Sequence, residues 1–274
     1  MDGGVVNILY RAVSEEGISS LGYAEIVDGE TVVRRSREPV LSPSGPHEEF
    51  GCEDPRITAV DGTCYVFYTA YSRKGTRIAL ASTRDFRNYE RHGVVGPDLD
   101  DKDCALFPQS LDGEAVVVHR VAPNIQLDFF QSIDQMRISN PYWKDYGKRV
   151  EANTIMKPRC KWEERKIGIG PPPIRTQDGW LMIYHGVDSH SVYRAGAALL
   201  DLENPRRVIA RIPEPILEPE RSFERVGLVP NVVFPEGAVV VNDILKVFYG
   251  GADKVCCVAS VPMKLMLEAL EAHS

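Results

Sequence analysis

The stretch GCEDPRITAVDGTCYVFYTAYS, residues 51–72, joins an acidic, proline-containing turn to runs of β-branched and aromatic residues. Val, Ile, Thr, Tyr and Phe favour strands, and the DG pair between the two runs is typical of a hairpin turn. The stretch therefore predicts two antiparallel strands. It also places Glu53, Asp54 and Arg56 just where the first of them begins.

The second of these strands belongs to a pattern that occurs five times. An apolar strand ends in an aromatic residue or His and is followed, after a polar turn, by a strand rich in small residues. The pairs are VVNILYRA with SLGYAEIV, CYVFYTAY with RIALASTR, AVVVHRVA with LDFFQSID, GWLMIYHG with AGAALLDL, and LKVFYGGA with VCCVASVP. The aligned residues Tyr10, Tyr68, His119, Tyr184 and Phe248 lie 51 to 65 residues apart.

Four of the five pairs are preceded by a further strand and a polar hairpin. Short strands repeated at this period predict an all-β fold, a five-bladed β-propeller that forms one domain over residues 1–274. The first blade is expected to be incomplete at the N-terminus. A β-sandwich with coincidental spacing is the alternative, disfavoured because the pattern recurs in the same order.

Two C-terminal segments depart from the strand pattern. VPMKLMLEALEAHS has apolar residues at helical spacing and predicts a short C-terminal helix. ARIPEPILEPERSFERVG is rich in proline and charge, which predicts a long surface connection.

Composition narrows the possible partners. The net charge is −7 and both signs are scattered along the 274 residues, so the sequence predicts neither a nucleic-acid nor a membrane footprint. The six cysteines lack metal-type spacing and are predicted to be reduced core thiols. No signal peptide or membrane span is recognisable, and a cytoplasmic protein without bound metal is expected.

Charged residues recur at equivalent places in the repeat. Asp54, Lys102 and Lys166 precede opening strands; Arg11, Arg120 and His185 end second strands; Asp253 closes a turn. Because propeller blades are radial, such positions converge at the mouth of the central channel. We therefore expect a cationic arc of Lys102, Arg120, Lys166 and His185 facing Asp54, suited to a small dianion such as phosphate.

Each residue also has a simpler interpretation when taken alone. Asp54 beside a proline is commonly a turn former, and Lys102 within DLDDKD is commonly a solvated charge. Arg56 is expected to pair with Asp54 or Glu53 rather than with a substrate. His119 is expected to be half-buried and hydrogen-bonded to the backbone, because its neighbour Arg120 points to the opposite face of the strand.

Stretches along nearly the whole chain resemble glycoside hydrolase family 130, five-bladed propellers that include the β-mannoside phosphorylases. They are LYRA, EDPRIT, YTAYS with RIALAST, DKDCALFPQ, VHR, KIGIGPPPI, GWLMIYHGVD, AGAALLDLENP, ILEPE, VPNVVFPEGAVV and FYGGAD. The resemblance implies that Asp54 is the proton donor, acting through a mannose hydroxyl. It implies phosphate binding by Lys102, Arg120, Lys166, His185 and Tyr193, and sugar binding by Arg11, Glu53 and Asp253. Two positions differ from the usual family residues: Lys102 stands where Arg is common and Gln109 where Glu is common.

The resemblance predicts an inverting phosphorylase that cleaves β-mannosides with inorganic phosphate to give mannose 1-phosphate. Phosphate is then a co-substrate, no other cofactor is needed, and a homo-oligomer is possible. A hydrolase of the same fold is the alternative, with Glu53, Glu236 or Asp253 as the base that an inverting hydrolase requires. A sugar-binding propeller without catalysis is the alternative from another class.

Overall fold

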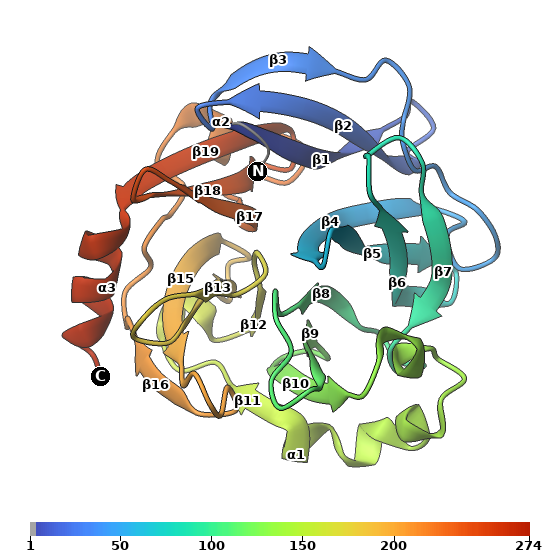
Figure 1. The fold of residues 1–274 in the computed structure, drawn as a ribbon. Coiled ribbons are helices and arrows are strands. Elements are labelled where there is room, and N and C mark those ends of the chain that lie inside the picture. The colour runs from blue at the N-terminus through green and yellow to red at the C-terminus, as the bar shows by residue number, and fades with distance from the viewer. Residues whose placement is uncertain (1–3) are drawn as a thin grey trace. The chain divides into compact units, whose positions relative to one another are not determined.

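The computed structural model describes residues 4–274 and consists mostly of β-strands with a few short helices (Figure 1). It divides into two compact units. The first comprises the described residues up to Val121 together with Asp128–Ala152, and the second comprises Ala122–Leu127 together with Asn153–Ser274. Within residues 4–274, no helix has the length and apolar character that crossing a membrane requires.

The first unit contains two antiparallel meanders and most of a third. Its strands are β1 (Val5–Val13), β2 (Ser19–Val27), β3 (Thr31–Arg35), β4 (Gly51–Val60), β5 (Thr63–Ser72), β6 (Gly75–Thr83), β7 (Glu90–Val95), β8 (Lys102–Leu106) and β9 (Ala115–Arg120). β1–β3 and β4–β7 form one sheet, because a single parallel bridge between Ser19 and Gly51 joins the two meanders. Each meander thus corresponds to one of the predicted repeats.

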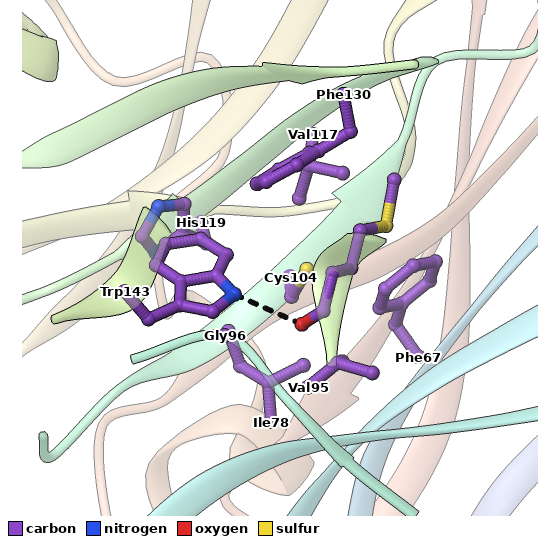
Figure 2. A pocket seen from close by; sticks show the side chains of 10 residues that line it. Phe67, Ile78, Val95, Gly96, Cys104, Val117, His119, Phe130 and Trp143 are labelled. Carbon is purple, nitrogen blue, oxygen red and sulfur yellow. Dashed lines mark hydrogen bonds between the residues drawn. The ribbon is translucent and has the colours of Figure 1, made fainter. Parts of the chain in front are cut away.

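The chain after β9 contributes several aromatic side chains to the core of the first unit. After β10 (Ile125–Phe130), the chain forms the 3₁₀ turns η1 (Ile133–Met136), η2 (Pro141–Trp143) and η3 (Tyr146–Lys148), then α1 (Val150–Asn153). Phe130, Trp143 and Tyr146 pack with Phe67 and Leu106. Figure 2 shows the lining of a small cavity in this core, where Trp143 Nε1 donates to the carbonyl of Met136 at 3.0 Å.

The second unit contains two further meanders. Its remaining elements are β11 (Thr154–Met156), η4 (Lys161–Glu163), β12 (Lys166–Ile169), β13 (Ile174–Arg175), β14 (Trp180–Val187), β15 (Tyr193–Leu200), β16 (Val208–Arg211), α2 (Ser222–Arg225), β17 (Val233–Val241), β18 (Ile244–Gly251), β19 (Val255–Pro262) and α3 (Met263–Glu271). The strand orders are β12-β14-β15-β16, with β13 also paired to β14, and β17-β18-β19.

The predicted C-terminal helix is confirmed as α3, which buries Met266 and Leu270 in the second unit's core. The proline-rich stretch from residue 210 to 227 is a connection only in part. It includes the end of β16 and the single-turn helix α2, where the Glu224 carboxylate accepts the N–H of Glu220 and Arg221. This local capping stabilises a helical turn in a stretch whose proline content predicts only a surface connection.

A buried glutamate in the connection ahead of an opening strand recurs three times. The glutamates accept the hydroxyl hydrogen of a second-strand tyrosine in the pairs Glu48–Tyr68 (2.6 Å), Glu163–Tyr184 (3.1 Å) and Glu224–Tyr249 (2.7 Å). Each also accepts a main-chain N–H from four residues earlier, donated by Ser44, Arg159 and Glu220 respectively. These carboxylates bind each connection to its meander. In the fifth repeat the tyrosine is Tyr249, one residue after the Phe248 that the sequence alignment placed there.

Close packing of a tyrosine ring explains one glycine in each of β2 and β15, two of the strands that the sequence predicts to be rich in small residues. The ring of Tyr10 lies over Gly22, where a Cβ would come within 2.3 Å of it, and the ring of Tyr184 lies over Gly196, where a Cβ would come within 2.5 Å. Only glycine permits such an approach.

The prediction of core thiols is only partly right. Cys52 and Cys104 are buried, whereas Cys256 is exposed because it lies on β19, the edge strand of its sheet.

Candidate active site

The acidic turn of residues 53–56 is a β-bulge within β4, not a loop ahead of it. Glu53 pairs with Thr69 and Arg56 with Phe67, so β4 carries one residue more than β5 across this interval. Asp54 takes up the extra length with φ 51°. A bulge changes the direction of the side chain at the point where it interrupts the strand pairing. In this bulge the Asp54 carboxylate points toward Arg11 and Lys102.

Two cations contact the Asp54 carboxylate, which is largely buried. Lys102 Nζ lies 3.4 Å from Oδ2, and Arg11 Nη1 lies 3.7 Å from Oδ1. The same Arg11 nitrogen lies 3.7 Å from Glu53 Oε2, while Ser19 Oγ donates to Glu53 Oε1 at 2.9 Å. Burial, followed by the neighbouring charge of Asp54, raises the pKa of Glu53. The structure therefore brings Arg11, Glu53, Asp54 and Lys102 together.

Lys102 and Arg120 are direct cross-strand partners on β8 and β9, so their side chains share one face of the sheet. Burial opposes the charge of Lys102, but the carboxylates of Asp54 and Asp103 outweigh it and raise the pKa of the ammonium. Arg120 is buried and its Nε donates to Asp103 Oδ2. Both predicted phosphate ligands of this unit are thus held as cations side by side.

Arg56 is buried beneath Asp54. Its Nη1 donates to the main-chain carbonyl of Asp54 at 2.7 Å, and its Nη2 lies 3.5 Å from Asp103 Oδ1. The expectation that Arg56 pairs with Asp54 is right for the backbone, whereas its carboxylate partner is Asp103. The connected group contains four cations and three carboxylates: Arg11, Arg56, Lys102 and Arg120 with Glu53, Asp54 and Asp103.

His119 points away from this group, but it is fully buried rather than half-buried, and its ring contacts side chains rather than the backbone that was predicted. Its Nδ1 lies 2.7 Å from Asp101 Oδ2 and its Nε2 lies 2.8 Å from Asp128 Oδ2, with Tyr146 also in contact. Burial disfavours the imidazolium, but the two carboxylates prevail and raise the pKa of His119 to about 10. This histidine is a buried cation that ties β9 to its surroundings.

The remaining predicted phosphate ligands form a group in the second unit. Lys166 and Tyr193 both pair with Val187, so they flank it on one face of the sheet, and Lys166 Nζ lies 5.5 Å from the Tyr193 ring centroid. The buried His185 ring lies 6.0 Å from that ring and 4.5 Å from the ring of Phe234. Lys166, His185 and Tyr193 therefore lie together with an aromatic neighbour.

Register shows that Lys166 is not at the position of Lys102. Lys102 pairs with Arg120, whereas His185, the equivalent of Arg120, pairs with Gly168. Lys166 stands two residues earlier, on the same face. Asp253 lies in the turn between β18 and β19 with φ 55°.

Three residues of these groups were not predicted: Ser19, Asp103 and Phe234. Asp103 had a usable signal, because it follows Lys102 as Asp54 follows Glu53, and it is the extra residue of an equivalent bulge with φ 55°. Ser19 and Phe234 come from other strands, and neither carries a sequence signal. Among residues 4–274, no group of three or more His, Cys, Asp or Glu side chains is placed to hold a metal ion.

Comparison with known proteins connects this geometry to one family. The family model for β-1,4-mannooligosaccharide phosphorylase, glycoside hydrolase family 130, matches residues 3–272. A 1,2-β-oligomannan phosphorylase of Thermoanaerobacter sp. (strain X514) is 42% identical over 96% of this chain and 88% of its own length. A β-1,2-mannobiose phosphorylase of the same strain is 44% identical over 86% of this chain and 74% of its own.

A solved structure agrees with the sequence matches. The β-1,2-mannobiose phosphorylase of Listeria innocua, in complex with β-1,2-mannobiose, superposes with a TM-score of 0.83 at 26% identity, covering 99% of this chain and 85% of that one. The family model, the two relatives and the superposed structure agree, and the chain belongs to glycoside hydrolase family 130.

Proposed function

We propose that this protein is an inverting β-mannoside phosphorylase, with inorganic phosphate as co-substrate and no further cofactor. The observation that carries the proposal is the contact between the buried Asp54 carboxylate and Lys102, which is paired directly across the sheet with Arg120. An acid in contact with one cation that has a second cation beside it suits a reaction in which a proton is given to a leaving group while an anion attacks.

In the proposed reaction, a phosphate oxygen attacks the anomeric carbon from the face opposite the leaving sugar. The bond from that carbon to the glycosidic oxygen breaks, and Asp54 supplies the proton that this oxygen takes up, through a mannose hydroxyl. The products are mannose 1-phosphate and the shortened glycan. Because phosphate already carries negative charge, its positioning by cations replaces the base that an inverting hydrolase needs.

The roles of the other residues follow from their chemistry. Lys102 and Arg120 of the first unit, and Lys166, His185 and Tyr193 of the second, are the proposed phosphate ligands. Arg11, Glu53 and Asp253 are the proposed sugar ligands. The first group supports this assignment, because Lys102 and Arg120 lie side by side on one face of the sheet, where two cations can bind one dianion.

We further propose that the chain is a single five-bladed propeller whose blades are β1–β3, β4–β7, β8–β11, β12–β16 and β17–β19. The five repeats in the sequence and the recurrent glutamate–tyrosine contacts support it. A propeller would direct equivalent strand ends to one channel mouth.

The proposed linkage is β-1,2. Two relatives above 40% identity are named for β-1,2-mannosides, whereas the family model is described by a β-1,4 activity. The sequences of whole relatives carry more weight here than the family description, because linkage depends on variable loops.

The function is tested by incubating the protein with β-1,2- and β-1,4-mannobiose, each with and without phosphate, and separating mannose 1-phosphate from free mannose. Phosphate-dependent mannose 1-phosphate from the β-1,2 disaccharide is the expected result. Free mannose independent of phosphate would instead establish a hydrolase, and absence of turnover would leave the sugar-binding alternative.

A further inference from the structure

Asp103 is a buried carboxylate that lies between two buried guanidinium groups. Its Oδ2 accepts from Arg120 Nε, and its Oδ1 lies 3.5 Å from Arg56 Nη2. All three side chains are almost fully excluded from solvent. Two guanidinium groups so placed would repel one another, and the carboxylate between them removes that repulsion.

The contacts of Asp103 lead to Asp54 by two routes. Through Arg56, Asp103 reaches the main-chain carbonyl of Asp54, to which Arg56 Nη1 donates at 2.7 Å. Through the backbone, Asp103 is joined to Lys102, whose Nζ lies 3.4 Å from Asp54 Oδ2. Arg56 therefore contacts the Asp54 backbone and Lys102 contacts the Asp54 carboxylate, and Asp103 is bonded to both of these residues.

The backbone conformation of Asp103 also affects where Lys102 points. It is the extra residue of the β8 bulge, with φ 55°, and its neighbour Lys102 keeps its pairing with Arg120. Non-glycine residues at positive φ carry strain unless surrounding contacts fix them. The two arginine contacts of Asp103 supply that fixing, and they thereby set the direction of Lys102.

We infer that Asp103 is a positioning residue that holds the proton donor Asp54 and the phosphate ligands Lys102 and Arg120 in one geometry. The inference rests on the proposed function. It predicts that loss of the Asp103 charge weakens phosphate binding and slows the reaction together, although Asp103 touches neither reactant. Binding of the sugar is expected to be unaffected, because Arg11 and Ser19 hold Glu53 without Asp103.

The test measures kcat and both KM values for Asp103→Asn and Arg56→Met, with phosphate affinity also measured by calorimetry in the absence of sugar. For Asp103→Asn we expect phosphate binding to weaken about tenfold, the effect of losing one charged hydrogen bond from Arg120 to phosphate once Arg120 is no longer held in place. We expect kcat to fall about 100-fold, the effect of a slightly misplaced catalytic group. For Arg56→Met we expect kcat to fall and phosphate binding to weaken less than in Asp103→Asn, because Asp103 still holds Arg120 although it has lost one of its two arginine contacts.

Asp101→Asn is the matched control. Asp101 is a buried carboxylate two residues away that contacts the cation His119 instead of the arginines. It should lower stability while leaving phosphate affinity within about twofold of wild type. Equal effects of Asp101→Asn and Asp103→Asn on phosphate affinity, or a folded Asp103→Asn with unchanged phosphate affinity, would overturn the inference.

These outcomes are separate from the test of function. If wild-type protein forms mannose 1-phosphate and Asp103→Asn does so equally well, the positioning role is wrong and the function stands. If wild-type protein neither binds phosphate nor uses it, the proposed function is wrong first. Should Asp103→Asn fail to fold, the kcat of Arg56→Met decides, since an unchanged value would contradict the coupling of Asp54 to Asp103.

Discussion

Replacing Asp54 by asparagine should move turnover and phosphate affinity in opposite directions. The amide keeps the shape of the carboxylate but has no proton of suitable acidity to give, so kcat should fall about 10²- to 10⁴-fold, the usual range for loss of a general acid. At the same time the negative charge that occupies Lys102 in the phosphate-free protein is removed. Phosphate should therefore bind more tightly to the inactive variant.

The size of the second effect follows from the contact distance. Two unit charges 3.4 Å apart, as at Lys102 Nζ and Asp54 Oδ2, attract by about 1 kcal/mol in water and about 5 kcal/mol at an effective dielectric constant of about 20. The Lys102 side chain is 27% exposed, which favours the lower end of that range. A gain of about 1.4 kcal/mol corresponds to about tenfold tighter phosphate binding.

Calorimetric titration of phosphate into the sugar-free protein measures this affinity directly. Asp145→Asn is the matched control, because Asp145 also contacts a lysine, Lys148 at 3.1 Å, but on the exposed surface of the same unit. That control should leave phosphate affinity unchanged. Weaker phosphate binding by Asp54→Asn would refute the reasoning, since it would mean that Asp54 supports the phosphate ligands rather than competing with phosphate for them.

Three further predictions concern the contacts that support the site. Glu163→Gln leaves the buried guanidinium of Arg211 without its Glu163 counter-charge. It should lower the free energy of unfolding by about 3 to 5 kcal/mol in urea titrations, whereas Glu164→Gln, at an exposed neighbour, should change it little. Gly196→Ala places a methyl group within 2.5 Å of the Tyr184 ring, and a loss of about 1 to 3 kcal/mol by the same measurement is expected. Folding raises the pKa of His119 from 6.5 to about 10. The protonated ring therefore stabilises the fold fully below about pH 6.5, and this stabilisation is lost as the pH rises to about 10. The difference in unfolding free energy between wild type and His119→Asn should shrink across that pH range.

Strand content was predictable because it is local. The run from Thr63 to Ser72 reads as a strand from its own residues, and β5 spans that range. The repeat then organises such strands into meanders, as the sheet order confirms. What the sequence could not supply is the bulge register, because an extra residue in β4 or β8 is defined only against its partner strand.

Contacts between distant residues account for the rest of what was missed. Arg56 and Asp103 are 47 residues apart, and no periodicity connects them. The glutamates that bind the second-strand tyrosines do share a local pattern, a proline five residues earlier and a His or aromatic residue just before, but that pattern does not name the tyrosine that each one binds. A sequence signal can mark such a residue, as it does for Asp103, but the partner that the residue binds is defined only when the chain is folded.

The second strands show how one repeat can serve both stability and chemistry. In β9 two neighbouring residues, His119 and Arg120, point to opposite faces, the first into a buried network with Asp101 and the second beside Lys102. In β14 the neighbours Tyr184 and His185 divide in the same way, with Tyr184 bound to its connection's glutamate. Because the side-chain period of a strand is two, the first residue can be fixed for folding while the second varies with the ligand. Such a strand therefore offers a position for chemistry without loss of the contact that holds its meander together, and this accounts for Arg120 and His185 each following a buried His or Tyr.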